Sequence, residues 1–520
     1  MARLQLIFPL LFWVLWLGTK DEAAAPLLSP GLGTCVYLGG LVGVVLLVAF
    51  QSAWAMRKTS LDRTTPVPRF HRTVFFARWF TLGWHATALW SLGFGDFVLQ
   101  TVPTYHGHFK SAAAFSSILP VIGAWVGLLA AQYPLERGVR EQNAMYAIEF
   151  GEPVRPVPTR LAYLMHAVRS QILFTLVPLF CIAVTRDSLA MALRALGFEA
   201  TQAETVSTLT AAVVVFVLAP EIIRRVLPTR SLPDSPARER LEAFAKSRNL
   251  GVRDILLWDT HHGMGNAAVM GVVPGIRYVM ITDLLLETMP AEELEAVFAH
   301  EAGHVVHRHI VWYVVFWLSM SQVLDSISNP AIGWLMRQFG TGSGVAESVI
   351  SVAGIAVLLL AFGMLSRLFE RQADAFASRP ADDEPPTRER AAVFASALRH
   401  VARVNNLPMD AHSMTAGRPF VGRMIGWLMH HAATWLHGSI RSRIDHVARL
   451  ADEPARAGRF DRTMALIRLL LLCALIGAAV TYVRDRRAEK ELPADQSWNK
   501  NSTSTDAFKG SEFTPTAARA

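Results

Sequence analysis

The chain has 520 residues, of which 52% are apolar and only 18% charged, and its mean hydropathy is +0.30. Because the apolar residues gather in long runs, this composition excludes a purely water-soluble protein. The net charge of +8 comes mostly from arginines and lysines that flank these runs without forming one basic patch, so we expect a membrane protein and no nucleic-acid partner. The three cysteines lie singly in apolar stretches and offer neither a disulfide framework nor a thiolate metal cage.

The first apolar stretch, residues 4–18, is shorter than the roughly 20 residues that a membrane-spanning helix needs. Small residues follow it at 23–25, so it is either a cleaved signal sequence or a short retained helix. We favour the retained helix.

Five later segments are long and apolar enough to cross a bilayer. They are residues 32–56, 112–131, 310–328, 349–365 and 463–483. Weaker candidates are residues 74–102, 171–196 and 208–223. Arg78, His85 and Asp96 are costly in lipid, so the first of these weaker segments forms either one span or two shorter interfacial pieces.

Basic residues concentrate in two of the loops between predicted spans, at 57–72 and 137–169. The positive-inside rule places these loops in the cytoplasm, and alternation then places residues 224–309 and 368–462 there as well. The last span would carry the basic start of the tail outward, against the same rule.

A helix is predicted from Pro290 through His309, because proline suits a first helical turn and glutamates follow it. On this helix His300 and His304 are four residues apart, so both imidazoles project from one face and can hold one zinc ion. Glu301 lies beside them, placed to take a proton from a metal-bound water. The alternative is an amphipathic helix whose histidines bond to backbone or water.

A catalytic zinc generally takes three protein ligands, and Glu370 is a candidate for the third. Asp374 lies one helical turn later and can accept the free N–H of a ligand histidine. The alternative is a solvated charged helix end, in which Arg367 and Arg371 pair with these carboxylates.

The segment His300-Glu-Ala-Gly-His304, followed by two spans and Glu370-Arg-Gln-Ala-Asp374, resembles the zinc metallopeptidases of peptidase family M48. This family includes the integral-membrane CAAX prenyl endopeptidases and the HtpX quality-control proteases. The similarity covers about residues 240–450.

Two further elements carry the resemblance. Asn266 and Ala267 are similar to the family's Asn-Ala strand, and His437 with Arg443 is similar to its His-Pro-x-x-x-x-Arg-Ile element. Gly438 stands where the family has proline, which puts the role of His437 in question.

The resemblance implies a gluzincin-type zinc metallopeptidase domain with His300, His304 and Glu370 on one zinc ion per chain and Glu301 as the general base. It further implies that Asn266 and Ala267 hold the substrate backbone, and that His437 and Arg443 stabilise the oxyanion. We expect His309 to support the helix instead of binding metal.

Strands predicted at 255–258, 267–272 and 277–282 form a small sheet, with linkers at 229–236 and 379–388. The expected fold is mainly α, a multi-pass transmembrane helical protein carrying this small β-sheet. Its regions are N-terminal transmembrane helices at 1–223, a cytoplasmic catalytic region at 224–309, a transmembrane hairpin at 310–368, a second catalytic region at 369–462, a C-terminal transmembrane helix at 463–483 and a disordered tail at 484–520.

The expected function is a membrane-embedded zinc endopeptidase that hydrolyses peptide bonds by a metal-activated water and resembles the CAAX prenyl endopeptidases in architecture. Its expected partners are the lipid bilayer and a peptide or protein substrate, prenylated or membrane-associated, and its oligomeric state is open. The active site is expected on the cytoplasmic side, at the inner membrane if the source is bacterial. The alternatives are an HtpX-like protease of misfolded membrane proteins and a non-catalytic, zinc-containing membrane scaffold or transporter.

Overall fold

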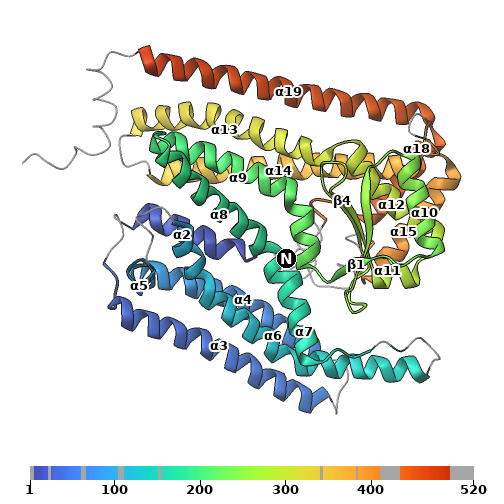
Figure 1. The fold of residues 1–520 in the computed structure, drawn as a ribbon, viewed down its shortest axis with the longest axis horizontal. Coiled ribbons are helices and arrows are strands. Elements are labelled where there is room, and N and C mark those ends of the chain that lie inside the picture. Colours follow the sequence, from blue (N-terminus) through green and yellow to red (C-terminus); the bar gives the residue numbers. More distant parts are fainter. Residues whose placement is uncertain are drawn as a thin grey trace, which may run out of the picture. The chain divides into compact units, whose positions relative to one another are not determined.

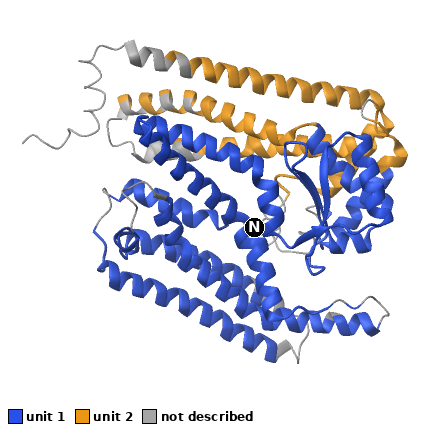
Figure 2. Ribbon diagram, in the orientation of Figure 1, with its two compact units in different colours: residues 1–306, 392–409 blue, residues 307–391, 410–520 orange. Residues whose placement is uncertain are grey.

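The structure is a computed structural model, and it describes residues 5–20, 25–59, 66–102, 110–149, 154, 156–339, 344–381, 384–409 and 434–491. The chain divides into two compact units, shown in different colours in Figure 2. Unit 1 comprises Met1–Val306 and Ala392–Met409, and unit 2 comprises His307–Ala391 and Asp410–Ala520. Unit 1 is therefore discontinuous in sequence.

The first part of unit 1 is a set of packed helices. They are α2 (Ile7–Thr19), α3 (Pro30–Thr59), α4 (Pro66–Trp90), α5 (Phe94–Thr101), α6 (Lys110–Glu149), α7 (Arg160–Ala167), the π-helix η2 (Val168–Leu173), α8 (Phe174–Ala195) and α9 (Ala200–Val226). Helix α3 packs on α4 and α6, α2 packs on the same two helices, and α8 pairs with α9 (Figure 1). The predicted apolar stretch at 4–18 forms α2, and its Trp13 and Trp16 are buried.

In the described part of the chain, seven helices are long and apolar enough to cross a membrane. They are Pro30–Arg57, Ser111–Glu149, Arg160–Ala195, Ala200–Val226, His309–Trp334, Ala353–Ala377 and Pro454–Thr481. Each overlaps one of the predicted spans, which confirms a mainly α-helical fold with multiple spans.

The predicted segment 74–102 is the exception, because the structure divides it into α4 and α5 and neither is among the seven. Gly93 lies between them with φ +76°, a left-handed conformation that glycine adopts without steric cost. This is the two-piece alternative, and His85 is fully buried there, where its Nδ1 lies 2.8 Å from the Tyr37 hydroxyl.

Unit 1 continues into a four-stranded sheet with the strand order β1-β2-β4-β3. Its elements are β1 (Thr229–Ser231), α10 (Pro236–Ser247), β2 (Val252–Trp258), β3 (Ala267–Met270), β4 (Arg277–Thr282), α11 (Asp283–Thr288) and α12 (Ala291–Val306). Strands β2 and β4 are parallel, whereas β1 and β3 lie antiparallel at the two edges. The three predicted strands are present, and β1 lies inside the predicted linker at 229–236.

Unit 2 consists of α13 (His309–Phe339), α14 (Gly344–Ala377), α18 (Ile440–Asp452) and α19 (Pro454–Glu491). Phe316, Phe369 and Met464 form its buried centre. Helix α15 (Arg388–Val404) starts in unit 2 and belongs to unit 1 from Ala392 onward. Residues 484–491 of the predicted tail continue α19, and residues 492–520 lie outside the described residues.

Candidate metal centre

Helix α12 carries the histidine pair. It begins directly after Pro290, whose carbonyl accepts the Leu294 amide at 2.9 Å, and Glu292 and Glu293 in the first turn complement the positive end of the helix dipole. One face of α12 packs into unit 1 and includes the fully buried Phe298, which anchors the helix beside the sheet. The start and the register predicted from the sequence are therefore those of the structure.

The two imidazoles of this helix converge. Nε2 of His300 and Nε2 of His304 lie 3.3 Å apart, and the two rings are nearly perpendicular. A tetrahedral zinc ion about 2.0–2.1 Å from each ring nitrogen would hold the two nitrogens about 3.3–3.4 Å apart. The geometry of the pair thus fits zinc, and Glu301, half-buried, follows His300 directly on the same turn.

Helix α15 supports α12 within unit 1. The Ser396 hydroxyl donates to Glu293 at 2.6 Å, Nδ1 of His400 lies 3.2 Å from the same carboxylate, and the Phe394 ring stacks on His300. These contacts orient the first zinc ligand, yet the residues of α15 lie about a hundred positions downstream and carry no motif. Sequence reasoning missed them for that reason.

Strand β3 contains the predicted substrate-binding pair. Thr282 holds the backbone of Asn266 by donating its amide to the Asn266 carbonyl at 3.0 Å and accepting the Asn266 amide at 2.9 Å. Asn266 is exposed and Ala267 is buried. Asn405, which the sequence did not single out, pairs with both backbone groups of Gly265 at 3.0 and 2.7 Å. The edge strand is thus held rigidly at its start.

The turn before α12 is organised by Asp283. Its carboxylate accepts the Thr260 hydroxyl at 2.5 Å and the amides of His262 and Leu284 at 2.9 Å each. Burial alone would raise the pKa of Asp283, but these hydrogen bonds outweigh burial and lower it. An ionised Asp283 therefore ties the β2–β3 loop to the start of α11.

In unit 2, Glu370 is buried on α14, and His437 lies next to it. Nδ1 of His437 is 2.9 Å from Oε1 of Glu370, and the His437 side chain is 63% exposed. Gly438 has φ +75°, which proline cannot adopt because its ring holds φ near −65°. The backbone at Gly438 therefore has a conformation that the proline found there in the family could not adopt.

Asp374 and Arg443 form a buried, two-pronged ion pair. Nε and an Nη of Arg443 donate to the two carboxylate oxygens of Asp374 at 3.0 and 2.6 Å, and Arg443 also lies 3.5 Å from Glu370. Asp374 has no exposed side-chain surface. Within unit 2, two of the predicted site residues thus hold each other, and the roles predicted for them remain predictions.

His309 lies at the start of α13, fully buried. Its ring stacks on Phe369 with centroids 4.3 Å apart, and its Nε2 lies 3.1 Å from the Gln372 side chain, which also accepts from Arg468 at 2.8 Å. His309 therefore packs and positions helices of unit 2. Neither Gln372 nor Arg468 was singled out from the sequence.

His300 and His304, in unit 1, and Glu370, in unit 2, each offer a ligand atom of a kind that binds metal ions. The donor set of two imidazoles and one carboxylate is the one that catalytic zinc takes in several metallopeptidases.

Comparison with known proteins supports the same chemistry. Residues 235–451 match the family described as Peptidase family M48. A protease HtpX homolog of Pyrobaculum islandicum is 28% identical over 225 residues, which cover 42% of this chain and 61% of the relative. An HtpX homolog of Burkholderia multivorans is 31% identical over 207 residues, which cover 38% of this chain and 66% of the relative.

A CAAX prenyl protease 1 homolog of Arabidopsis thaliana is 28% identical over 160 residues, 28% of this chain and 37% of the relative. The chain thus spans less than two thirds of the length of each of these relatives. The crystal structure of S. mikatae Ste24p aligns with 80% of this chain and 98% of that chain, with a TM-score of 0.38 and 14% identity.

Proposed function

Because residues 235–451 match the model of peptidase family M48, we propose that this protein is a membrane-embedded zinc endopeptidase of this family. The observation that supports the proposal most directly is the convergence of the His300 and His304 ring nitrogens at 3.3 Å, with Glu370 as the third candidate ligand. A structural zinc site would not need Glu301, and the relatives are named as proteases, so a non-catalytic scaffold or transporter is not favoured.

In the proposed site His300, His304 and Glu370 hold one zinc ion, whose chemistry when bound is to lower the pKa of water and polarise the scissile carbonyl. Glu301 takes the proton of the attacking water and passes it to the leaving amine. No covalent intermediate with a side chain is needed.

The substrate backbone is proposed to pair with β3, because this strand lies at the edge of the sheet and extended peptides add to such edges. Asn266 and Ala267 lie at the start of that edge. We propose that His437, which is exposed, donates to the developing oxyanion. Arg443 pairs with Asp374 and lies near Glu370, and we propose that it contributes positive charge to the same oxygen.

The seven apolar helices make the protein an integral membrane protein, and the basic loops support a cytoplasmic active site, at the inner membrane if the source is bacterial. The substrates are peptides or proteins. Relatives named for HtpX and for CAAX prenyl protease leave prenylated and unprenylated substrates to be distinguished by experiment.

The test compares the detergent-purified protein with Glu301→Gln on a panel of prenylated and unprenylated peptides, with bound zinc measured in both. We expect unchanged zinc and a loss of cleavage of about 10²–10⁴-fold, because the general base alone is removed. Glu292→Gln is the matched control, since it changes an exposed glutamate on the same helix. Equal cleavage by Glu301→Gln and the native protein would refute the assigned role, and absence of zinc from the native protein would refute the site.

A further inference from the structure

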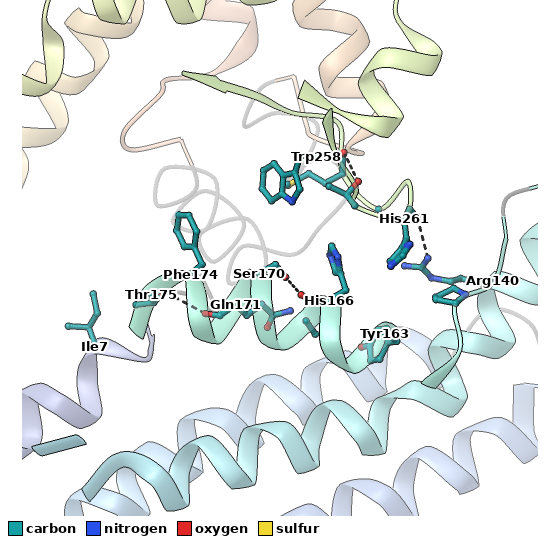
Figure 3. A pocket seen from close by; sticks show the side chains of 15 residues that line it. Ile7, Arg140, Tyr163, His166, Ser170, Gln171, Phe174, Thr175, Trp258 and His261 are labelled. Atoms are coloured by element: carbon teal, nitrogen blue, oxygen red, sulfur yellow. Dashed lines mark hydrogen bonds between the residues drawn. The ribbon is translucent and has the colours of Figure 1, made fainter. Parts of the chain in front are cut away.

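Unit 1 contains a cavity of about 880 Å³ that the proposed peptidase chemistry does not use. Its walls come from the α7–η2–α8 helix, from α2 and α6, and from the loop between β2 and β3 (Figure 3). In Figure 3, His166 and Phe174 project from the helix toward Trp258, at the end of β2, and His261, in the loop after it. A cavity of this size is in the range that binds small molecules and lipid groups.

One end of the cavity is lined by potential donors to an anion. Arg140 lies there with an Nη 3.4 Å from the His261 carbonyl, and the rings of His166 and His261 are 5.2 Å apart. Among the described residues that line the cavity, none is Asp or Glu. Two carboxylates lie outside the lining: Glu136 pairs with Nε of Arg140 at 2.9 Å, and Asp259 lies 3.4 Å from Nδ1 of His261.

A second guanidinium acts on the same end through Gln171. Arg78 donates to Oε1 of Gln171 at 3.5 Å, which leaves the NH₂ group of the Gln171 amide as a donor for the cavity. Arg78 forms no ion pair with any residue in the described part of the chain, and its charge is partly buried against Trp125. An anion in the cavity would meet this uncompensated positive charge.

His166 provides a polar atom without a partner. Its Nδ1 is buried and makes no hydrogen bond with the described residues, a state that costs free energy unless a ligand or water completes it. The local backbone is unusual as well, since the π-helix η2 directly follows α7 and π-helical turns often occur at functional sites. Gln171 belongs to this turn, Phe174 directly follows it, and His166 lies two residues before it.

The other end of the cavity is apolar, lined by Ile7, Phe174 and Met264. Its helical wall belongs to the candidate span Arg160–Ala195, whereas the β2–β3 loop belongs to the sheet region. A ligand that fits both ends has an anionic head and a hydrocarbon tail.

We propose that the cavity binds an anionic phospholipid, with its phosphate against Arg140, His166 and Gln171 and an acyl chain against Ile7 and Phe174. The proposal does not rest on the peptidase activity. It makes the phospholipid a bound constituent of the folded protein, because the head group compensates Arg78 and completes His166.

The test uses native mass spectrometry of the full-length protein, delipidated in detergent and titrated with phosphatidylglycerol or phosphatidylcholine. We expect one tightly retained phosphatidylglycerol, and binding at least about tenfold weaker in Arg140→Gln and in His166→Leu, because each loses a hydrogen bond to a charged group. Arg137→Gln is the matched control, since Arg137 lies on the same helix, is 57% exposed and pairs with Glu141 outside the cavity. Melting temperatures of the variants report folding separately from binding.

Equal retention of phosphatidylglycerol by the native protein and both variants would overturn the proposal, as would equal affinity for phosphatidylcholine. A competition experiment with inorganic phosphate distinguishes the phosphate of a lipid head group from free phosphate as the ligand. Displacement of phosphatidylglycerol by phosphate at comparable concentrations would refute the lipid as occupant and assign the cavity to the free anion. If Arg140→Gln fails to fold, His166→Leu decides the outcome alone.

Discussion

Unit 2 contains two arginine–aspartate ion pairs, of which one has a buried aspartate and the other an exposed aspartate. Asp374, with no exposed surface, receives two hydrogen bonds from Arg443, whereas Asp461, 42% exposed, receives one from Arg379 at 2.8 Å. A buried pair that loses one partner leaves a charge without compensation, but an exposed pair loses little because water replaces the partner.

We therefore predict that Asp374→Asn lowers the free energy of unfolding by about 3 kcal/mol, against less than about 1 kcal/mol for Asp461→Asn. Thermal unfolding of both variants without zinc measures the difference and separates it from metal binding. A similar loss of unfolding free energy in the two variants would mean that burial does not increase the contribution of the Asp374–Arg443 pair to stability.

His446 on α18 predicts how stability depends on pH. Burial lowers the pKa of His446 to about 4, with Arg371 acting in the same direction, and its Nε2 has no hydrogen-bond partner in the described residues. The unfolded chain binds the proton near pH 6.5. His446 thus contributes stability that is complete above pH 6.5 and is lost as the pH falls toward about 4.

The variant His446→Leu should therefore lose less melting temperature between pH 7 and pH 5 than the native protein does. Arg441→Gln, at an exposed position of the same helix, should follow the native curve. Parallel curves for His446→Leu and the native protein would show that another group controls acid unfolding.

For single residues, the sequence predicted the candidate metal ligands but not the side chains that position them. His300 and His304 are recognisable because four residues of one helix determine their geometry. The Ser396–Glu293 and Gln372–His309 contacts each join residues more than 60 positions apart. Such contacts depend on how the helices pack, so no local sequence pattern predicts them.

Among the elements, the π-helix and the end of α9 are joined by Arg169. Its side chain donates to the carbonyls of Val226, Arg225 and Leu227 at 2.6, 3.1 and 2.9 Å. The last carbonyls of a helix lack partners within the helix, and a cation there also favours the negative end of the helix dipole. Arg169 thus caps α9 where the chain turns into β1.

We predict that Arg169→Met destabilises this junction by about 2 kcal/mol, the value of hydrogen bonds to a charged group. Hydrogen exchange at the amides of Leu227 and Thr229 should accelerate, because both belong to the uncapped turn. Arg160→Met, which removes an exposed arginine from the preceding helix, should leave these amides unchanged. Unaltered exchange in Arg169→Met would contradict the capping role.

The sequence predicted elements well where one periodicity runs for a whole segment and less well at their ends. The long apolar spans and the strands β2, β3 and β4 follow from such patterns. β1 has three residues and is a strand only because it pairs with β2, with Thr229 opposite Trp258. The break at Gly93 likewise depends on one backbone conformation inside an apolar run.

For the whole molecule, the proposed zinc ion predicts a coupling between metal and stability. An ion bound only by the folded protein stabilises it by about 4 kcal/mol when its concentration is a thousand times the dissociation constant. Chelation should therefore lower the melting temperature of the native protein and of His262→Ala, and should not lower that of His304→Ala further. An equal effect of chelation on His304→Ala would place the stabilising ion elsewhere.

The last part of unit 1, Ala392–Met409, follows His307–Ala391 in the sequence, and those residues belong to unit 2. The ribosome makes α12 long before it makes Ser396, His400 and Asn405, which support α12 and the start of β3. During synthesis the histidine pair therefore exists without its scaffold until α13 and α14 have been made. A nascent chain stalled before residue 396 therefore lacks the α15 contacts that orient the proposed metal site, so any activity of that site can begin only after α15 has been made.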